Sequence, residues 1–174
     1  MNYFELYELP VSFILDKNEV KRKFYQLSKK YHPDFYTLES EEKQAEILEL
    51  STLTNEAYQV LSDDDKRMKY VLSLRNMLDE EGKAQIPQDF LMEMMDVNET
   101  LMELEFDFDE NNFSQLKNTL REKENALYET VHSTLENYQD GTTPDSELKK
   151  IKEYYYKKRY LLRIQENLNK FAPQ

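Results

Sequence analysis

The chain has 174 residues, which is enough to bury a hydrophobic core in one domain or in two small ones. It contains no cysteine, and this excludes a disulfide framework, a thiolate metal site and a cysteine nucleophile. The formal net charge of -12 argues against general nucleic-acid binding, because contacts with phosphate groups need clustered Lys and Arg.

The composition predicts an all-α protein made of two small domains. The chain has only two glycines and five prolines, and Leu, Lys, Glu and Tyr recur at helical rather than alternating spacing. No run of about 18 apolar residues occurs, and the N-terminal residues lack the basic and apolar regions of a secretory leader. We therefore expect a cytoplasmic protein without a membrane segment.

The N-terminal half is predicted to contain three main helices. The first begins at Asp16, a capping residue with Glu19 three positions later, and runs to about Tyr31. Pro33 disfavours helical backbone at His32, so His32 is expected to begin a loop. Residues 40–63 are expected to form a second helix, and residues 64–74 a short third one. The predicted core face of the second helix consists of Leu50, Leu53, Ala57 and Leu61.

The C-terminal half is predicted to be a three-helix bundle, with helices near residues 88–106, 111–139 and 144–171. Glycine and proline in residues 79–87 indicate a linker before it. We place the domains at residues 1–76 and 88–174, with 77–87 as the linker. The core face of the first bundle helix is predicted to be Phe90, Met94, Val97, Leu101 and Leu104. In the last helix it is predicted to be Leu148, Ile151, Tyr155 and Leu162.

The first long helix carries a local positive charge. Between Asp16 and Tyr31 there are six basic residues and two acidic ones. The buried stripe of this helix is predicted to be Val20, Phe24, Leu27 and Tyr31, and the residues that point away from it include Lys21, Arg22, Gln26 and Lys29. This face would attract a partner with an acidic surface. The alternative is an inert solvated face, which is common for surface charges.

Two segments, FYQLSKKYHPD and NEAYQVLSDDDKRMKY, resemble a J-domain, the module by which J-proteins act on heat-shock-70-class chaperones. The resemblance covers roughly residues 1–75. It implies that His32, Pro33 and Asp34 engage the ATP-bound chaperone and trigger ATP hydrolysis in the active site of that partner. The chaperone-binding residues that it implies are Lys21, Arg22, Gln26, Lys29, His32, Pro33 and Asp34. We therefore expect no enzyme activity, cofactor or metal in this chain itself.

The chain departs from many J-domains at two places. Tyr25 and Gln26 stand where basic residues are frequent, and Phe35 and Tyr36 follow the His-Pro-Asp tripeptide where Lys or Arg is common. These differences predict electrostatic steering that is weaker or tuned to one chaperone.

Three further segments, NYFELYELP, KYVLSL and DFLMEMMDVNETLMEL, are similar to HscB-type co-chaperones of iron-sulfur cluster assembly. The resemblance then covers nearly the whole chain. It implies two partners: a chaperone of the HscA or DnaK type, and an iron-sulfur scaffold protein of the IscU type that the C-terminal bundle binds and presents. Nucleic acid and membrane are not expected as partners.

A second apolar set in residues 88–106 lies off the predicted core face. Leu91, Met92, Met95 and Met102 alternate with carboxylates, and residues 84–116 contain nine acidic residues and no basic one. Methionine adapts to binding surfaces, so this set predicts a binding patch with an acidic rim. With the resemblance, the predicted scaffold-binding residues are Leu91, Met92, Met95, Asp96, Glu99, Glu103 and Tyr160.

Alternatives to this interpretation stay open. Leu91 and Met95 could simply widen the core, and Tyr160 could form a second packing face with Ile164 and Phe171. The client of the J-protein could be a different one. A carboxylate-rich metalloenzyme is suggested by Glu129 and His132, which have the Glu-x-x-His spacing of di-iron bundles, but the second copy that such a site needs does not occur.

Overall fold

The computed structural model describes residues 1–171, and they contain helices and no strand, which confirms the all-α prediction. The chain divides into two compact units. The first comprises Met1–Asn76 together with Leu135–Thr143, and the second comprises Met77–Thr134 and the described residues from Pro144 onward. The domain boundaries at 76 and 88 stay predictions, and positions 172–174 of the predicted bundle lie outside the described residues.

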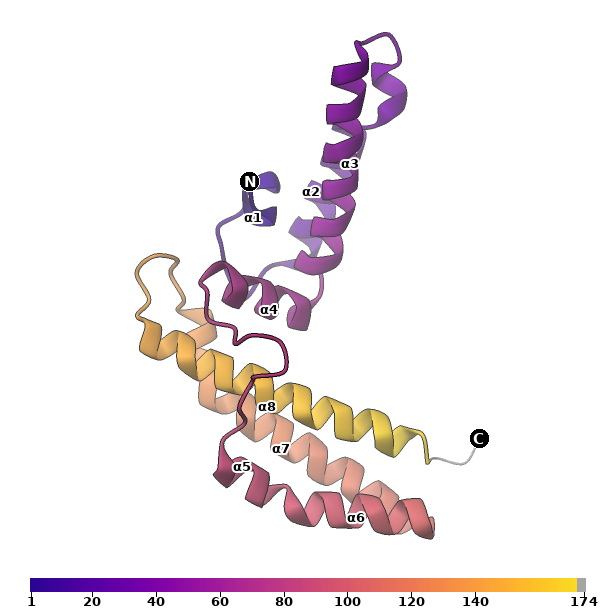
Figure 1. Ribbon diagram of the computed structural model, residues 1–174, viewed down its shortest axis with the longest axis vertical. Coiled ribbons are helices and arrows are strands. Elements are labelled where there is room, and N and C mark those ends of the chain that lie inside the picture. The colour runs from indigo at the N-terminus through magenta and orange to yellow at the C-terminus, as the bar shows by residue number, and fades with distance from the viewer. Residues whose placement is uncertain (172–174) are drawn as a thin grey trace. The chain divides into compact units, whose positions relative to one another are not determined.

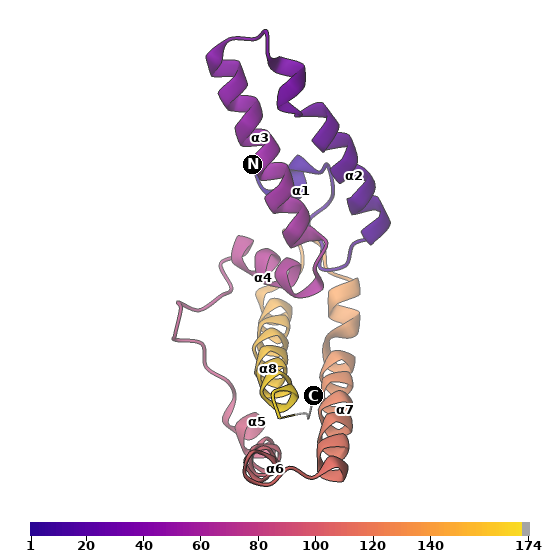
Figure 2. The same cartoon turned by 90° about the vertical axis from the view of Figure 1, so that its right-hand side faces the viewer.

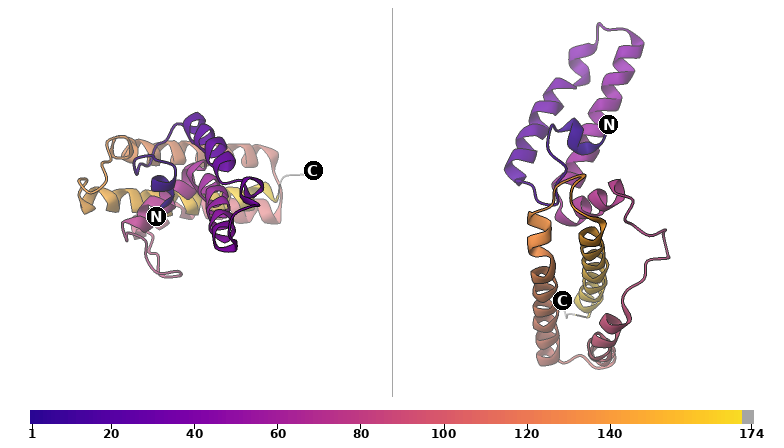
Figure 3. Two further views of the ribbon diagram at one scale, coloured as in Figure 1. Left: turned by 90° about the horizontal axis from the view of Figure 1, so that it is seen from above. Right: turned by 90° about the vertical axis from the view of Figure 1, so that its left-hand side faces the viewer.

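The first unit contains the helices α1 (Tyr3–Leu6), α2 (Lys17–Lys30), α3 (Glu41–Leu61) and α4 (Asp64–Leu74), and the short 3-10 helix η1 (Pro33–Tyr36). Helices α2 and α3 lie side by side and antiparallel, and the segment that contains η1 joins them at one end (Figures 1 and 2). Helix α1 packs against α3 (Figure 3).

Side-chain caps fix where these helices begin. The Asp16 carboxylate accepts a hydrogen bond of 2.9 Å from the Asn18 backbone N–H, which confirms Asp16 as the cap of α2. Ser40 caps α3 and Asp63 caps α4 in the same way, each by accepting from the backbone N–H three residues later. Each cap satisfies a donor that the first helical turn leaves without a partner.

The core of the first unit differs from the predicted face of α3. Ala57 and Leu61 are buried as expected, but Leu50 and Leu53 are only half-buried, and Ile47 and Thr54 are buried in addition. At Thr54 the physical reason is helix α1, which packs on α3 and is followed by the buried Tyr7. The Tyr7 hydroxyl donates a 2.8 Å hydrogen bond to the Thr54 carbonyl oxygen. Burial of this hydroxyl raises the pKa of Tyr7, and the neighbouring Tyr58 raises it further.

A buried arginine links the segments of the first unit. Arg67 on α4 is 3% exposed and donates to the Phe13 carbonyl oxygen at 3.0 Å, to the Leu61 carbonyl oxygen at 2.7 Å and to the Asp64 carboxylate at 2.7 Å. A buried guanidinium needs such partners, because an unpaired buried charge is strongly unfavourable.

The second unit contains α5 (Gln88–Glu93), α6 (Met95–Phe106), α7 (Glu110–Glu136) and α8 (Asp145–Asn169). The prediction of one continuous helix over 88–106 is wrong, because the backbone of Met94 (φ -85°, ψ -4°) separates α5 from α6. The Met94 N–H donates to the carbonyl oxygens of both Phe90 and Leu91, which tightens the last turn of α5. The predicted helix ending at 139 stops at Glu136.

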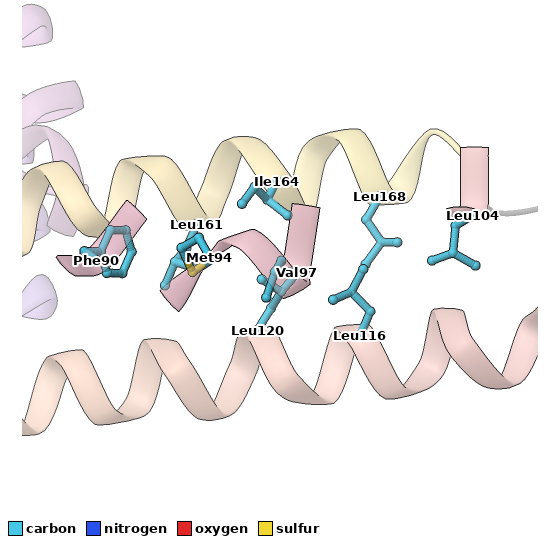
Figure 4. Close-up of a cluster of buried hydrophobic side chains, with 9 residues drawn as sticks. All are labelled: Phe90, Met94, Val97, Leu104, Leu116, Leu120, Leu161, Ile164 and Leu168. Atoms are coloured by element: carbon cyan, nitrogen blue, oxygen red, sulfur yellow. The ribbon is translucent and has the colours of Figure 1, made fainter. Parts of the chain in front are cut away.

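Nine buried side chains from the four helices form one hydrophobic cluster in the core of this unit (Figure 4). They are Phe90, Met94, Val97, Leu104, Leu116, Leu120, Leu161, Ile164 and Leu168. The predicted face of residues 88–106 is confirmed, with Leu101 packed at its edge. In α8, Leu148, Ile151 and Tyr155 are buried as predicted, but Leu162, which was also predicted to be buried, is 44% exposed. The C-terminal half of α8 packs against α6, so its buried side rotates to Leu161 and its neighbours.

The segment before α5 is held against α8. The Asp79 backbone N–H donates to the Tyr156 hydroxyl at 3.0 Å, and Lys152 approaches the Asp79 carboxylate at 3.4 Å. Among the helices of residues 1–171, none is long and apolar enough to cross a membrane.

Candidate functional site

The basic face predicted for α2 is exposed. Lys21, Arg22, Gln26 and Lys29 are all open to solvent, while Val20 on the opposite side is fully buried. The other three residues of the predicted stripe, Phe24, Leu27 and Tyr31, are half-buried. Phe24 stacks on Tyr58 of α3 at a ring distance of 4.3 Å. The structure thus brings the charged residues to the side of α2 that faces away from α3.

Other basic residues of α2 have contacts within the first unit. Lys23 is largely buried and lies 3.7 Å from the Glu8 carboxylate, and Lys17 lies 3.7 Å from that of Asp64. The ammonium group of Lys30 lies over the Tyr31 ring. Lys21, Arg22 and Lys29 are therefore the exposed cations of α2 that the proposal below uses, and Lys17 and Lys30 are exposed as well.

The His-Pro-Asp tripeptide forms an ordered turn. As predicted, α2 ends before His32, and the backbone of His32 is extended (φ -71°, ψ 123°). His32 caps the 3-10 helix η1, with Pro33 in the first helical position. The Nδ1 atom of His32 accepts a 3.2 Å hydrogen bond from the Asp34 backbone N–H. The Asp34 side chain is 85% exposed, which leaves its carboxylate open to a partner.

Hydrogen bonds link the turn and the residues after it to the end of α2 and to α3. The Tyr36 hydroxyl donates to the Lys30 carbonyl oxygen at 2.7 Å, and the Gln44 side-chain amide donates to the carbonyl oxygens of Thr37 and Glu39. Tyr36 thus has a structural role that the sequence did not reveal. Phe35 is instead 68% exposed and packs edge-on against the His32 ring.

The apolar set on α5 and α6 lies outside the core. Met92 is 64% exposed, Met95 is 65% exposed and Leu91 is 38% exposed, so the hypothesis that Leu91 and Met95 widen the core is wrong. The three carboxylates predicted beside them, Asp96, Glu99 and Glu103, are exposed as well. Exposed apolar side chains with an acidic rim form a surface suited to a partner with apolar and basic groups.

Tyr160 on α8 has a packing role. It is half-buried against the nine-residue core, its ring lies edge-on to Phe90 at 5.7 Å, and its hydroxyl accepts a 2.8 Å hydrogen bond from the Asn98 side chain. Ile164, one turn later, is buried in the same core. Tyr160 and Ile164 therefore form a packing face, as the alternative interpretation of the sequence stated. A binding role of Tyr160 stays a proposal.

The Glu-x-x-His pair, Glu129 and His132, lies on α7 and is not part of the surfaces on α2, α5 and α6 described above. The His132 ring packs edge-on against Tyr128 at 5.2 Å, and Glu129 is exposed. Across residues 1–171, no group of three or more His, Asp or Glu side chains is arranged to hold a metal ion.

Comparison with known proteins identifies the family. Residues 2–70 match the model of the DnaJ domain, and residues 86–169 match that of the HSCB C-terminal oligomerisation domain. A co-chaperone protein HscB homolog of Vibrio parahaemolyticus is 35% identical over 138 residues, which cover 73% of this chain and 80% of that protein. The chain belongs to the HscB family of co-chaperones.

Other HscB proteins match over different lengths. The HscB homolog of Psychromonas ingrahamii is 29% identical over 84% of this chain and 86% of that protein. Against HscB homologs of Vibrio cholerae and Vibrio vulnificus, the chain spans about three fifths of the relatives' length.

Two solved structures have the same fold. The crystal structure of human co-chaperone protein HscB superposes with a TM-score of 0.75 at 26% identity, over 97% of this chain and 81% of that one. Chaperone HscB from Vibrio cholerae superposes with a TM-score of 0.67 at 24% identity, over 99% of this chain and 100% of that one.

Proposed function

We propose that this HscB-family protein stimulates the ATPase of a heat-shock-70-class chaperone, of the HscA or DnaK type, and delivers an iron-sulfur scaffold protein of the IscU type to it. The observation that carries the proposal is the exposed turn of His32, Pro33 and Asp34 at the end of the basic face of α2, in a chain with both domains of the family. The place of action that we propose is the cytoplasm.

The turn and the basic face have different tasks in this proposal. Lys21, Arg22 and Lys29 attract an acidic surface of the chaperone and raise the rate of encounter, with Gln26 as a neutral contact between them. The Asp34 carboxylate then forms a charge-assisted contact with the ATP-bound chaperone. The bracing of η1 by Tyr36 and Gln44 supports this role, because a preorganised turn loses little entropy on binding.

ATP hydrolysis takes place in the chaperone in this proposal, and the present chain is not an enzyme. It needs no cofactor and no metal ion for this role. Its contribution is binding energy that favours the hydrolysis-competent state of the partner, in the manner of any ligand with unequal affinity for two states.

The client surface is the apolar centre on α5 and α6 with its acidic rim. Leu91, Met92 and Met95 serve as apolar anchors, and Asp96, Glu99 and Glu103 orient basic groups of the scaffold. Tyr160 contributes at the edge, where it contacts Phe90. The choice of an iron-sulfur scaffold as the client is supported by the family, and a J-protein with another client is the second candidate.

The test is recovery of partners from the native cell. A tagged full-length chain, incubated with ATP, should recover a heat-shock-70-class chaperone and the iron-sulfur scaffold together, as identified by mass spectrometry. A tagged Asp34→Asn chain serves as the matched control and should recover the scaffold with much less chaperone. Recovery of the chaperone with a different client would favour the second candidate, and recovery of no such chaperone would contradict the proposal.

A further inference from the structure

Helix α6 exposes apolar side chains beyond the client surface described above. Met102 and Phe106 follow Met95 by 7 and 11 residues, and at about 100° per residue these spacings place all three on one side of the helix. Met102 is 69% exposed and Phe106 is 96% exposed. Exposed apolar side chains therefore occur from Met95 at the start of α6 to Phe106 at its end. The turn that joins α6 to α7 follows Phe106 (Figure 2).

The Phe106 side chain is exposed, whereas the nearby Phe108 and Phe113 are partly buried. Phe108 and Phe113 pack against each other at a ring distance of 5.4 Å and lie against the nine-residue core. Asp107, between Phe106 and Phe108, has extended backbone (φ -146°, ψ 102°) and ends α6. Two aromatic rings at this turn are thus partly buried, while the third is left almost wholly in water, where burial by a partner would be favourable.

A hollow of about 620 Å³ lies at this turn. Its lining includes the two apolar side chains Met102 and Phe106 and four carboxylates, Glu99, Glu103, Asp107 and Asp109. We call this hollow and its lining the α6–α7 corner.

The charge of the α6–α7 corner determines what fits it. Its lining has four carboxylates and no Lys, Arg or His, and residues 84–116 as a whole contain no basic residue. A second copy of the same surface would place carboxylates against carboxylates, and like charges across an interface are strongly disfavoured. A segment with Lys or Arg beside an apolar side chain satisfies both the carboxylates and the exposed Phe106.

We propose that the α6–α7 corner is a second anchor for the client, and that it takes an extended client segment with at least one Lys or Arg next to a large apolar side chain. This inference rests on the proposed function, and it assigns Met102, Phe106 and Asp107 to client recognition. The shared residues Glu99 and Glu103 make the corner continuous with the first client surface.

The first experiment is calorimetric titration of the purified iron-sulfur scaffold into full-length protein. Met102→Ala with Phe106→Ala should weaken binding about five- to tenfold, the loss typical of an exposed apolar anchor. Leu162→Ala is the matched control, because Leu162 is exposed on α8 and does not line the corner. It should bind like the wild type, and melting curves of all three proteins should coincide.

The charge of the corner is tested separately by Asp107→Asn. This variant should bind more weakly at low salt and approach wild-type affinity at high salt, because exposed charges are screened. Asp109 is unsuitable for the same test, since its carboxylate accepts the Asn112 backbone N–H at 3.0 Å and helps to begin α7.

The outcomes separate this inference from the proposed function. If truncation of Leu91, Met92 and Met95 abolishes scaffold binding and truncation at the corner changes nothing, the corner is not a client site and only this inference fails. If neither truncation changes the affinity, the client surface of the proposed function fails as well.

A photo-crosslinking amino acid at position 106 identifies the occupant directly. In a mixture of full-length protein and purified scaffold, the crosslinked peptide should come from a scaffold segment that contains Lys or Arg. Crosslinks only to a second copy of this chain, or to a scaffold segment without a basic residue, would overturn the inference.

Discussion

The side-chain amide of Asn98 on α6 donates a 2.8 Å hydrogen bond to the hydroxyl of Tyr160 on α8. The Tyr160 ring also lies edge-on to Phe90 on α5. One side chain thus joins three helices, two of which carry the proposed client surface. Tyr160 therefore fixes the positions of α5 and α6, whether or not it also touches the client.

Replacing Tyr160 by Phe separates these two roles. The ring and its packing remain, while the hydrogen bond to Asn98 is lost, so the stability of the bundle should fall by about 1 kcal/mol. Thermal unfolding followed by circular dichroism measures this change. Scaffold affinity should stay within about twofold of the wild type, and a loss of more than about tenfold in a folded variant would show that the Tyr160 hydroxyl contacts the client directly.

The basic face of α2 predicts salt-dependent association. Lys21→Glu with Arg22→Glu should slow association with the chaperone at low salt, and raising the salt concentration should reduce the difference, because exposed charges are screened over about 10 Å at 0.1 M salt. Stopped-flow or surface-based kinetics measure the rates. Lys66→Glu with Lys69→Glu on α4 makes the same change in net charge at exposed positions and serves as the control. Equal association rates for both variants would mean that the α2 face is merely solvated.

The client surface predicts loss of binding without loss of folding. Leu91→Ala, Met92→Ala and Met95→Ala together should weaken scaffold binding, at about 1 kcal/mol or more for each central anchor. Because these side chains are exposed, the melting temperature should change little. The matched control is Leu161→Ala, which truncates a 3% exposed core residue and should cost about 2–5 kcal/mol of stability. Undiminished affinity of the folded triple variant would remove this patch from the client site.

Local pattern predicted the features that depend on neighbours in sequence. The cap at Asp16 and the core face from Phe90 to Leu104 follow from side-chain chemistry and a period of 3.6 residues, and both are confirmed. The same period placed Met92 and Met95 off this face, but it left open whether Met95 widens the core, and the structure shows that both are exposed.

Features that depend on distant contacts could not be predicted in this way. Thr54 is buried because Tyr7 bonds to its carbonyl, and the core face of α8 shifts to Leu161 because another helix packs there. In the same way, the order of the tripeptide turn depends on Tyr36, whose hydroxyl reaches back to the end of α2. The spacing of apolar residues within one helix does not show which distant side chain or helix will pack on it, so these contacts could not be predicted.

The last two residues of α7 and the segment that follows them are a further case. Residues 135–143 belong to the first compact unit, where Tyr138 lies edge-on to Phe13 at 4.8 Å and Asp140 lies 3.6 Å from Arg75. Hydrophobic periodicity assigns residues to helix faces, but it cannot say which unit a connecting segment joins.

Single-turnover ATP hydrolysis by the partner chaperone, measured with wild-type protein and with Asp34→Asn, tests the central claim most directly. The substitution keeps the shape of the side chain and the backbone N–H that bonds to His32, so the circular dichroism spectrum should not change. Loss of a charge-assisted contact, at about 1.5–3 kcal/mol, predicts that stimulation falls at least tenfold. Glu39→Gln, the same chemical change in the same exposed connection, should stimulate fully. Full stimulation by folded Asp34→Asn protein would contradict the account.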